Sequence, residues 1–216
     1  MTESAGLIVL NCTKIKDSTV VVHTLSREYG RRSFISSVKK GSAMTMFLPL
    51  NIIEATVTEN PKSQLWRIGS ISLKYSLSDI RNNIYKNTMT LFMSEVLFKT
   101  LKDGAREEGL FEICEKAILS LDALKSDFAN FHLYFLLELA SALGFSPSIE
   151  DLAPFVEDNL AVVGKFLNLS FAEAMLIPLK GEERNRIAES IIKYIAFHCE
   201  CNLNIRSLEV LRQIYE

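Results

Sequence analysis

The sequence predicts a mixed α+β fold in which an N-terminal OB-like β-barrel is followed by an all-α helical domain. Residues 1–75 contain five short stretches rich in β-branched residues, whereas beyond residue 80 the apolar residues recur at helical spacing. Charge divides in the same way. Residues 1–80 hold 10 Lys and Arg against 6 Asp and Glu, net +4, and residues 81–216 hold 14 against 20, net −6. We therefore expect a basic domain over residues 1–78 and an acidic one over residues 79–216.

The expected strands are separated by turn residues. Lys16-Asp17-Ser18 and Asn60-Pro61-Lys62 are turns by composition, and Tyr29-Gly30 supplies another because glycine tolerates positive φ without steric cost. In the fourth strand, apolar residues at 53, 55 and 57 alternate with polar ones, which predicts one buried and one solvated face. The expected strands span residues 7–16, 19–25, 33–38, a stretch that Pro49 opens, and 64–75.

The fifth strand changes phase in its middle. Trp66 and Ile68 are apolar at even positions, whereas Ile71 and Leu73 are apolar at odd ones, and Gly69 lies at the change. A β-bulge at this glycine would insert one residue and let a long strand turn a barrel corner. Five strands with one bend fit an OB-type barrel, and an SH3-like barrel would show nearly the same pattern.

The helical domain should begin after a short seam at residues 76–79, where Ser78 or Asp79 can cap a helix. Three long helices are expected, over residues 84–98, 110–124 and 128–143, and the last should close at Gly144. The first is apolar on most sides, so it should be central to a bundle. In the second, Glu112, Glu115 and Lys116 should point outward. Later helices are expected at 187–198 and 208–214, with Pro154 and Pro178 breaking short ones before them.

Composition excludes several classes of protein. The 48% hydrophobic content can supply a real core, so the chain is not disordered. The N-terminal stretch lacks the apolar region of a secretion signal, and no apolar run approaches the roughly 20 residues that span a bilayer. We expect no membrane association and a cytoplasmic, nucleoid-associated location. Four cysteines form no CxxC pair, and Cys12 and Cys114 should be small buried apolar residues.

The sequence shows no catalytic or metal-binding constellation. Gly104 and Gly109 have phosphate-loop spacing, but Leu110-Phe111 stands where Lys-Ser/Thr is required. His198-Cys199-Glu200-Cys201 offers three possible ligands but lacks a fourth. We therefore expect that the protein binds no metal ion or cofactor and is not an enzyme. Stacking on nucleic-acid bases is one use for Tyr29, Phe34 and Trp66, but on the strands of a small barrel we expect them to be core residues. Asn130 should form hydrogen bonds within the bundle or to its loops.

The chemistry of the chain is concentrated in residues 27–41, which carry five cations and one acid. One hairpin tip should hold three cations close together, Arg27, Arg31 and Arg32. The end of the next strand should hold two more, Lys39 and Lys40. Close like charges cost free energy unless an anion lies against them, so the stretch predicts a nucleic-acid surface; a solvated turn is the alternative. Lys14 and Lys16, which share a face of the first strand, complete the candidate DNA-binding set.

The chain resembles the RecO family of bacterial recombination mediators. The resemblance rests on R-E-Y-G-R at residues 27–31, L-F-M-S-E-V-L-F at residues 91–98, and A-N-F-H-L-Y-F-L-L-E-L at residues 129–139 ahead of L-G-F-S-P. It covers about residues 5–147 well and the remainder loosely. One departure is that many RecO proteins carry a four-cysteine zinc motif after the third long helix, whereas residues 146–178 contain no cysteine. The resemblance therefore transfers no zinc site.

The resemblance implies a non-enzymatic protein of recombinational repair. Such a protein binds single- and double-stranded DNA, anneals complementary strands, and works with RecR so that RecA replaces the single-stranded-DNA-binding protein. The alternative is a protein–protein adaptor whose helical domain docks repair partners with little direct DNA binding. A nuclease site assembled from scattered acids is a third alternative, although no constellation supports it.

Overall fold

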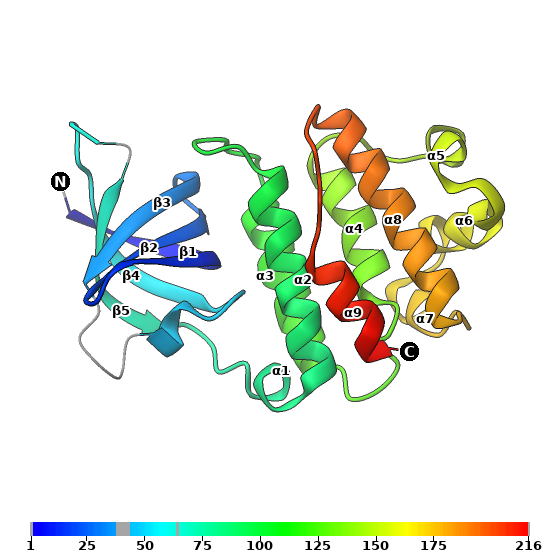
Figure 1. Cartoon of the computed structure of the whole chain (residues 1–216), viewed down its shortest axis with the longest axis horizontal. Helices are drawn as coiled ribbons and strands as arrows, with labels where there is room; N and C mark the ends of the chain where they lie inside the picture. The colour runs from blue at the N-terminus through cyan, green and yellow to red at the C-terminus, as the bar shows by residue number, and fades with distance from the viewer. Residues whose placement is uncertain (1, 38–43, 64, 216) are drawn as a thin grey trace. The chain divides into compact units, whose positions relative to one another are not determined.

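In the part of the chain that the structure describes, five strands close into a barrel in the order β1-β2-β3-β5-β4 (Figure 1). The computed structural model describes residues 2–37, 44–63 and 65–215. The strands are β1 (Thr2–Lys16), β2 (Thr19–Ser26), β3 (Gly30–Ser37), β4 (Ile52–Thr58) and β5 (Trp66–Leu73), and a 3₁₀ turn, η1 (Met44–Phe47), precedes β4. This strand order confirms the predicted OB-like barrel.

The long strand β1 closes the barrel by pairing on both of its edges. Residues 2–8 pair with β4, and residues 7–16 pair with β2. The sequence prediction started this strand at Leu7, because residues 2–6 are polar or small and give no apolar signal; their backbone nevertheless pairs with β4. The opposite seam is short. β3 and β5 run parallel, and the pairs between them are Phe34 with Trp66 and Ile35 with Arg67.

Alternate side chains of the strands fill the barrel. Phe34 is completely buried, which confirms its predicted place in the core; Tyr29 and Trp66 are only partly buried and pack against the same cluster. The predicted bulge is also confirmed. Between the pairs Thr56–Gly69 and Glu54–Ser72, β5 has one residue more than β4, and Ser70 has φ +46°. Leu73, predicted to point inward, is instead exposed at the end of the strand.

The three long predicted helices are confirmed within a few residues as α2, α3 and α4. Gly144, which follows α4, has φ +87°, as its predicted closing role requires. Pro154 does not break a helix as predicted. It lies inside α5, which continues for two residues beyond it. A proline within a helix removes one backbone hydrogen bond, and α5 tolerates that loss. The helices are α1 (Ser78–Asn82), α2 (Ile84–Thr100), α3 (Leu110–Ala123), α4 (Phe131–Ala142), α5 (Ile149–Val156), the 3₁₀ turn η2 (Glu157–Asn159), α6 (Leu160–Asn168), α7 (Phe171–Met175), α8 (Gly181–His198) and α9 (Ser207–Tyr215).

The chain forms two compact units. The first joins Met1–Ser78 with Ser94–Glu115, so that the end of α2, the α2–α3 loop and the start of α3 belong with the barrel. The second joins Asp79–Met93 with Lys116–Glu216. The domain division at residue 78 stays a prediction. Within the described residues, no helix combines the length and the apolar character needed to cross a membrane.

Buried polar side chains tie the helical unit together. The Asn130 amide donates to the carbonyl oxygens of Ala174, Met175 and Ile177 at 3.2, 3.4 and 2.8 Å, and its oxygen accepts from Arg184 Nε at 3.0 Å. This network confirms the hydrogen-bonding role predicted for Asn130. It also holds the turn between α7 and α8 against the start of α4, because each buried carbonyl needs a donor.

Lys86 is fully buried in the same unit. Its ammonium group donates to the Asp79 carboxylate and to the carbonyl oxygens of Asp122 and Leu124. The carbonyl groups belong to the C-terminal end of α3, where the helix dipole favours a cation. The lysine therefore joins α1, α2 and α3 at one point.

The burial of His132 on α4 leads us to predict that the protein loses stability in mild acid. Burial, with a smaller contribution from the charge of Arg184, lowers the pKa of His132 from 6.5 to about 3. Below pH 6.5, His132 is therefore protonated in the unfolded chain but remains neutral in the folded chain. The free energy of unfolding is highest above pH 6.5 and decreases as the pH falls below it. The loss for this residue should be about 2 kcal/mol at pH 5.

The measurement is the free energy of unfolding in urea at pH 7 and pH 5. His132→Leu, which removes the titrating group, should lose clearly less stability between the two values than the natural protein does. Part of the loss should remain, because burial also lowers the pKa of His23. An equal loss in both proteins would contradict this role for His132.

Candidate nucleic-acid interface

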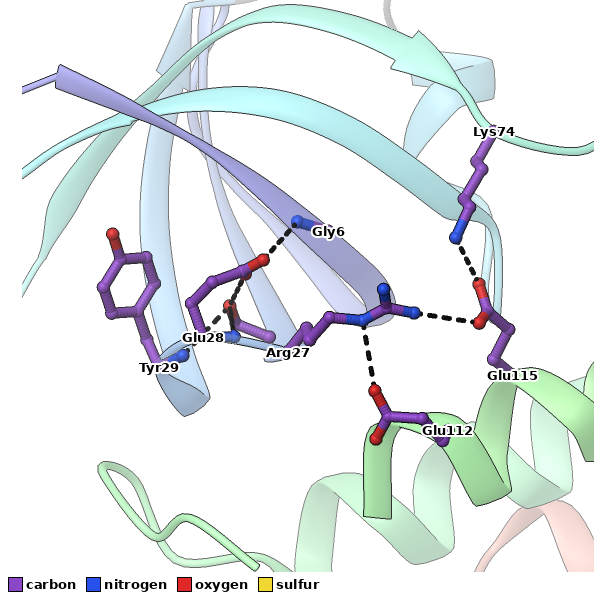
Figure 2. Close-up of polar contacts among 8 residues, drawn as sticks. Gly6, Arg27, Glu28, Tyr29, Lys74, Glu112 and Glu115 are labelled. Carbon is purple, nitrogen blue, oxygen red and sulfur yellow. Dashed lines mark hydrogen bonds and ion pairs between the residues drawn. The ribbon is translucent and has the colours of Figure 1, made fainter. Parts of the chain in front are cut away.

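The turn between β2 and β3 is fixed by short polar side chains (Figure 2). Ser26 Oγ donates to the Glu28 carboxylate at 3.1 Å and accepts from the backbone N–H groups of Glu28 and Tyr29 at 3.2 and 3.3 Å. The Gly6 N–H group of β1 donates to the same carboxylate at 3.5 Å. The turn that presents Arg27 is therefore held in one conformation.

Gly30 allows the α2–α3 loop to lie directly against the start of β3. Its φ is +64°, and a Cβ atom at this position would lie 2.1 Å from the Ala105 carbonyl oxygen. On either side of this contact, the Arg31 N–H group donates to Ala105 at 2.8 Å and Gly104 donates to the Arg31 carbonyl at 2.7 Å. The loop thus pairs with β3 in the manner of a short strand, and only glycine fits at the crossing.

Arg31 is buried beneath that loop. Only 5% of the residue is exposed, its guanidinium group lies 4.9 Å from the Phe98 ring centroid, and its Nη1 atom contacts the Asp103 carboxylate at 3.3 Å and Ser33 Oγ at 3.2 Å. Burial lowers the pKa of Arg31, and Asp103 opposes that shift. The sequence predicted a solvent-facing cation here, but the side chain is part of the packing.

Arg27 is also engaged by acidic side chains of α3. Its Nε atom lies 3.2 Å from Glu112, its Nη2 atom 3.0 Å from Glu115, and its guanidinium group 4.7 Å from the Phe111 ring centroid (Figure 2). Lys74, just beyond β5, reaches the other oxygen of Glu115 at 2.8 Å. Glu115 was predicted to point outward, but it lies between two cations, with 14% of its side chain exposed.

Arg32 points to the face of β3 opposite Arg31, because successive residues of a strand alternate. Its guanidinium group lies 4.6 Å from the Trp66 ring centroid, and Trp66 in turn packs edge-on against Tyr29. The three arginines lie within six residues of sequence, but Arg31 and Arg32 point to opposite faces of β3, so the structure does not gather all three on one surface.

Two of the candidate lysines lie near the other end of these strands. Lys14 and Lys16 are exposed at the end of β1, and Lys14 makes a solvated ion pair with Asp17 at 3.1 Å. Lys39 and Lys40 lie outside the described residues; in sequence they follow Ser37, the last residue of β3. Ser37 pairs with Thr19 at the end of β2 opposite the turn.

A groove of about 630 Å³ opens where β3 and β5 part. Arg67 lines it, and Thr19, next to Lys16 in the β1–β2 register, lines it as well. Arg67 is not among the site residues predicted from the sequence. The signal was present, because Arg67 alternates with the inward-facing Trp66 and Ile68 along β5. The described lining consists of Thr19, Ile35, Ser36, Ser37, Met46, Arg67, Ile68, Gly69, Ser70 and Ile71.

The described residues offer no group of three or more His, Cys, Asp or Glu side chains that could hold a metal ion. Cys114 is fully buried, and burial raises its pKa to about 12, so its thiol is unreactive at neutral pH. Cys12, also predicted to be buried, is partly exposed. The arrangement suits binding of an anion by cations and hydroxyl groups.

Comparison with known proteins gives matches over nearly the whole chain. A family model described as "Recombination protein O C terminal" matches residues 81–153. The chain is 28% identical over 233 residues to the DNA repair protein RecO of Phocaeicola vulgatus, covering 96% of this chain and 97% of that protein. It is 26% identical over 235 residues to the RecO protein of Bacteroides fragilis, with 97% of each covered. With the RecO protein of Flavobacterium psychrophilum the identity is 26% over 231 residues, covering 96% of this chain and 97% of that one.

The contrast between Arg31 and Arg32 gives a test of stability. Arg31→Ala should lower the free energy of unfolding by about 2–3 kcal/mol, because it removes packing against Phe98 and leaves polar groups of the loop without their partner. Arg32→Ala should cost about 1 kcal/mol or less, since it removes one cation–π contact. Urea unfolding of the two variants measures the difference. Equal losses would show that the burial of Arg31 does not stabilise the barrel.

Proposed function

We propose that this chain, which belongs to the RecO family, is a mediator of recombinational DNA repair that binds DNA through the groove between β3 and β5. Its relatives over 96–97% of its length are DNA repair proteins, and a role in DNA repair and recombination follows from that relationship. Direct DNA binding is the finer part of the proposal and rests on the chemistry of the groove.

The observation that carries the proposal is the combination of cations with hydroxyl groups at one end of the barrel. Arg67 supplies a guanidinium group in the groove, and Thr19 and Ser70 supply hydroxyl groups that can donate to phosphate oxygens. Lys16 neighbours the groove in the strand register, and the sequence places Lys39 and Lys40 just after Ser37. Neutralising phosphates releases counterions from DNA, which drives binding without reading the bases.

The proposed mechanism needs no bond chemistry, so we propose a binding protein rather than an enzyme. Both single- and double-stranded DNA present the phosphate pattern that such a groove recognises, and a protein that holds two strands near each other helps them to anneal. By analogy with the family, the proposed partners are RecR and the single-stranded-DNA-binding protein, with RecA acting downstream.

The test uses oligonucleotide binding followed by fluorescence anisotropy over a range of salt concentrations. Lys16→Gln with Arg67→Gln should weaken binding and flatten the salt dependence by about 1.4 in the log–log slope, since each cation engaged on single-stranded DNA contributes about 0.7. The sole tryptophan, Trp66, precedes Arg67 and gives a label-free signal for the same titration.

The matched control is Lys193→Gln with Arg186→Gln, which removes the same charge at exposed positions of α8. It should leave the slope near its natural value. If both double variants lowered the slope equally, net charge rather than the groove would explain the binding. If the natural protein bound no DNA at any salt concentration, the protein–protein adaptor function would replace this proposal.

A further inference from the structure

The strongest unexplained feature is a carboxylate that bridges two cations near the β2–β3 turn (Figure 2). Glu115 places one oxygen 2.8 Å from Lys74 Nζ and the other 3.0 Å from Arg27 Nη2. Glu112 adds a second carboxylate at 3.2 Å from Arg27 Nε. A phosphodiester likewise presents two anionic oxygens on one central atom, so the two cations are spaced for a phosphate as well as for Glu115.

The charges of this cluster cancel. Arg27 and Lys74 contribute two positive charges, and Glu112 and Glu115 contribute two negative ones, so the cluster as it stands offers little attraction to DNA. Of the three ion pairs, that of Arg27 with Glu112 is the most exposed, whereas Glu115 is held between two cations with 14% of its side chain exposed. The side chains of Arg27 and Glu112 are 42% and 56% exposed, and ion pairs at such exposure are weak and screened by salt.

The cluster and the groove are separate places on the barrel. Ser26 pairs with Gly30 at the turn end of the β2–β3 hairpin, whereas Thr19, which lines the groove, pairs with Ser37 at the open end. Seven residue steps separate these pairs along β2, which corresponds to about 23 Å of strand. A phosphate bound near Arg27 would therefore belong to a different DNA segment, or a different strand, from one bound in the groove.

We propose that Arg27 and Lys74 form a second phosphate-binding site for nucleic acid, which Glu112 and Glu115 occupy as intramolecular competitors. The inference rests on the proposed function. DNA enters the site when a backbone phosphate replaces the Glu115 carboxylate, and the release of the two glutamates sets the affinity of the second site. A protein with two such sites holds two strands at once, which is the requirement for annealing them.

The test compares the natural protein with Glu112→Gln plus Glu115→Gln. The glutamines keep the size of the side chains but remove the competing charge, so both cations become available. Binding of a mixed-sequence single-stranded oligonucleotide at low salt should tighten by roughly three- to tenfold, and the log–log salt slope should steepen by about 1.4. Adding Arg27→Gln to the double variant should cancel at least half of the gain in slope.

Two controls separate this effect from others. Glu182→Gln with Glu189→Gln removes the same charge from exposed positions of α8 and should leave the slope unchanged. Glu112→Gln alone, at the more exposed acid, should give a smaller change in the same direction and guards against loss of folding in the double variant. Thermal unfolding of every variant confirms that each is folded.

The outcomes distinguish the two proposals. If the natural protein binds through the groove and the Glu112 and Glu115 variants bind no tighter than the α8 control, the second site is refuted and the proposed function stands. If the natural protein fails to bind but the double variant binds, and Arg27→Gln abolishes that binding, the second site is supported and the groove is not. If none of the proteins binds DNA, both proposals are overturned.

Discussion

The antiparallel pairing of β2 with β3 is the constraint on which the cationic chemistry of this protein depends. Eight residues pair with eight, from Ser26 and Gly30 at the turn to Thr19 and Ser37 at the open end. This register sends Arg31 and Arg32 to opposite faces of β3, and it separates the Arg27 turn from the residues that precede Lys39 and Lys40. A stretch that is continuous in sequence is thereby divided into two ends of a hairpin.

The protein supplies its own anions at one of these ends. Asp103 lies against Arg31, and Glu112 and Glu115 lie against Arg27. Arg31 is enclosed under the α2–α3 loop, where its charge is a cost of folding that Asp103 offsets, so we assign it to stability. Arg27 remains partly exposed, and it can exchange a carboxylate for a phosphate. Burial, rather than sequence position, decides which arginine can take part in binding.

The fold could be predicted from the sequence because it depends on local patterns. Alternation within the strands, the phase change near Gly69 and the helical spacing beyond residue 80 each report the environment of a short segment. The candidate site was accessible only in part. Ala105 lies against Gly30, and Glu115 forms an ion pair with Arg27. Both contacts join residues that are far apart in sequence, so no local pattern predicts them. Alternation with Trp66 and Ile68 indicates that Arg67 faces outward, but an isolated cation on a strand has no neighbouring cations in sequence that would mark it as part of a site.

Hydrogen–deuterium exchange with and without a single-stranded oligonucleotide tests most directly where DNA meets the barrel. We expect added protection of backbone amides in residues 16–20 and 66–71, which border the groove. Amides of residues 30–33 and 102–105 should be unchanged, because the α2–α3 loop covers Arg31 and leaves no groove there for DNA. Protection confined to residues 30–33 and 102–105, with none along β5, would contradict the account and return the binding surface to the face of β3 that the loop covers.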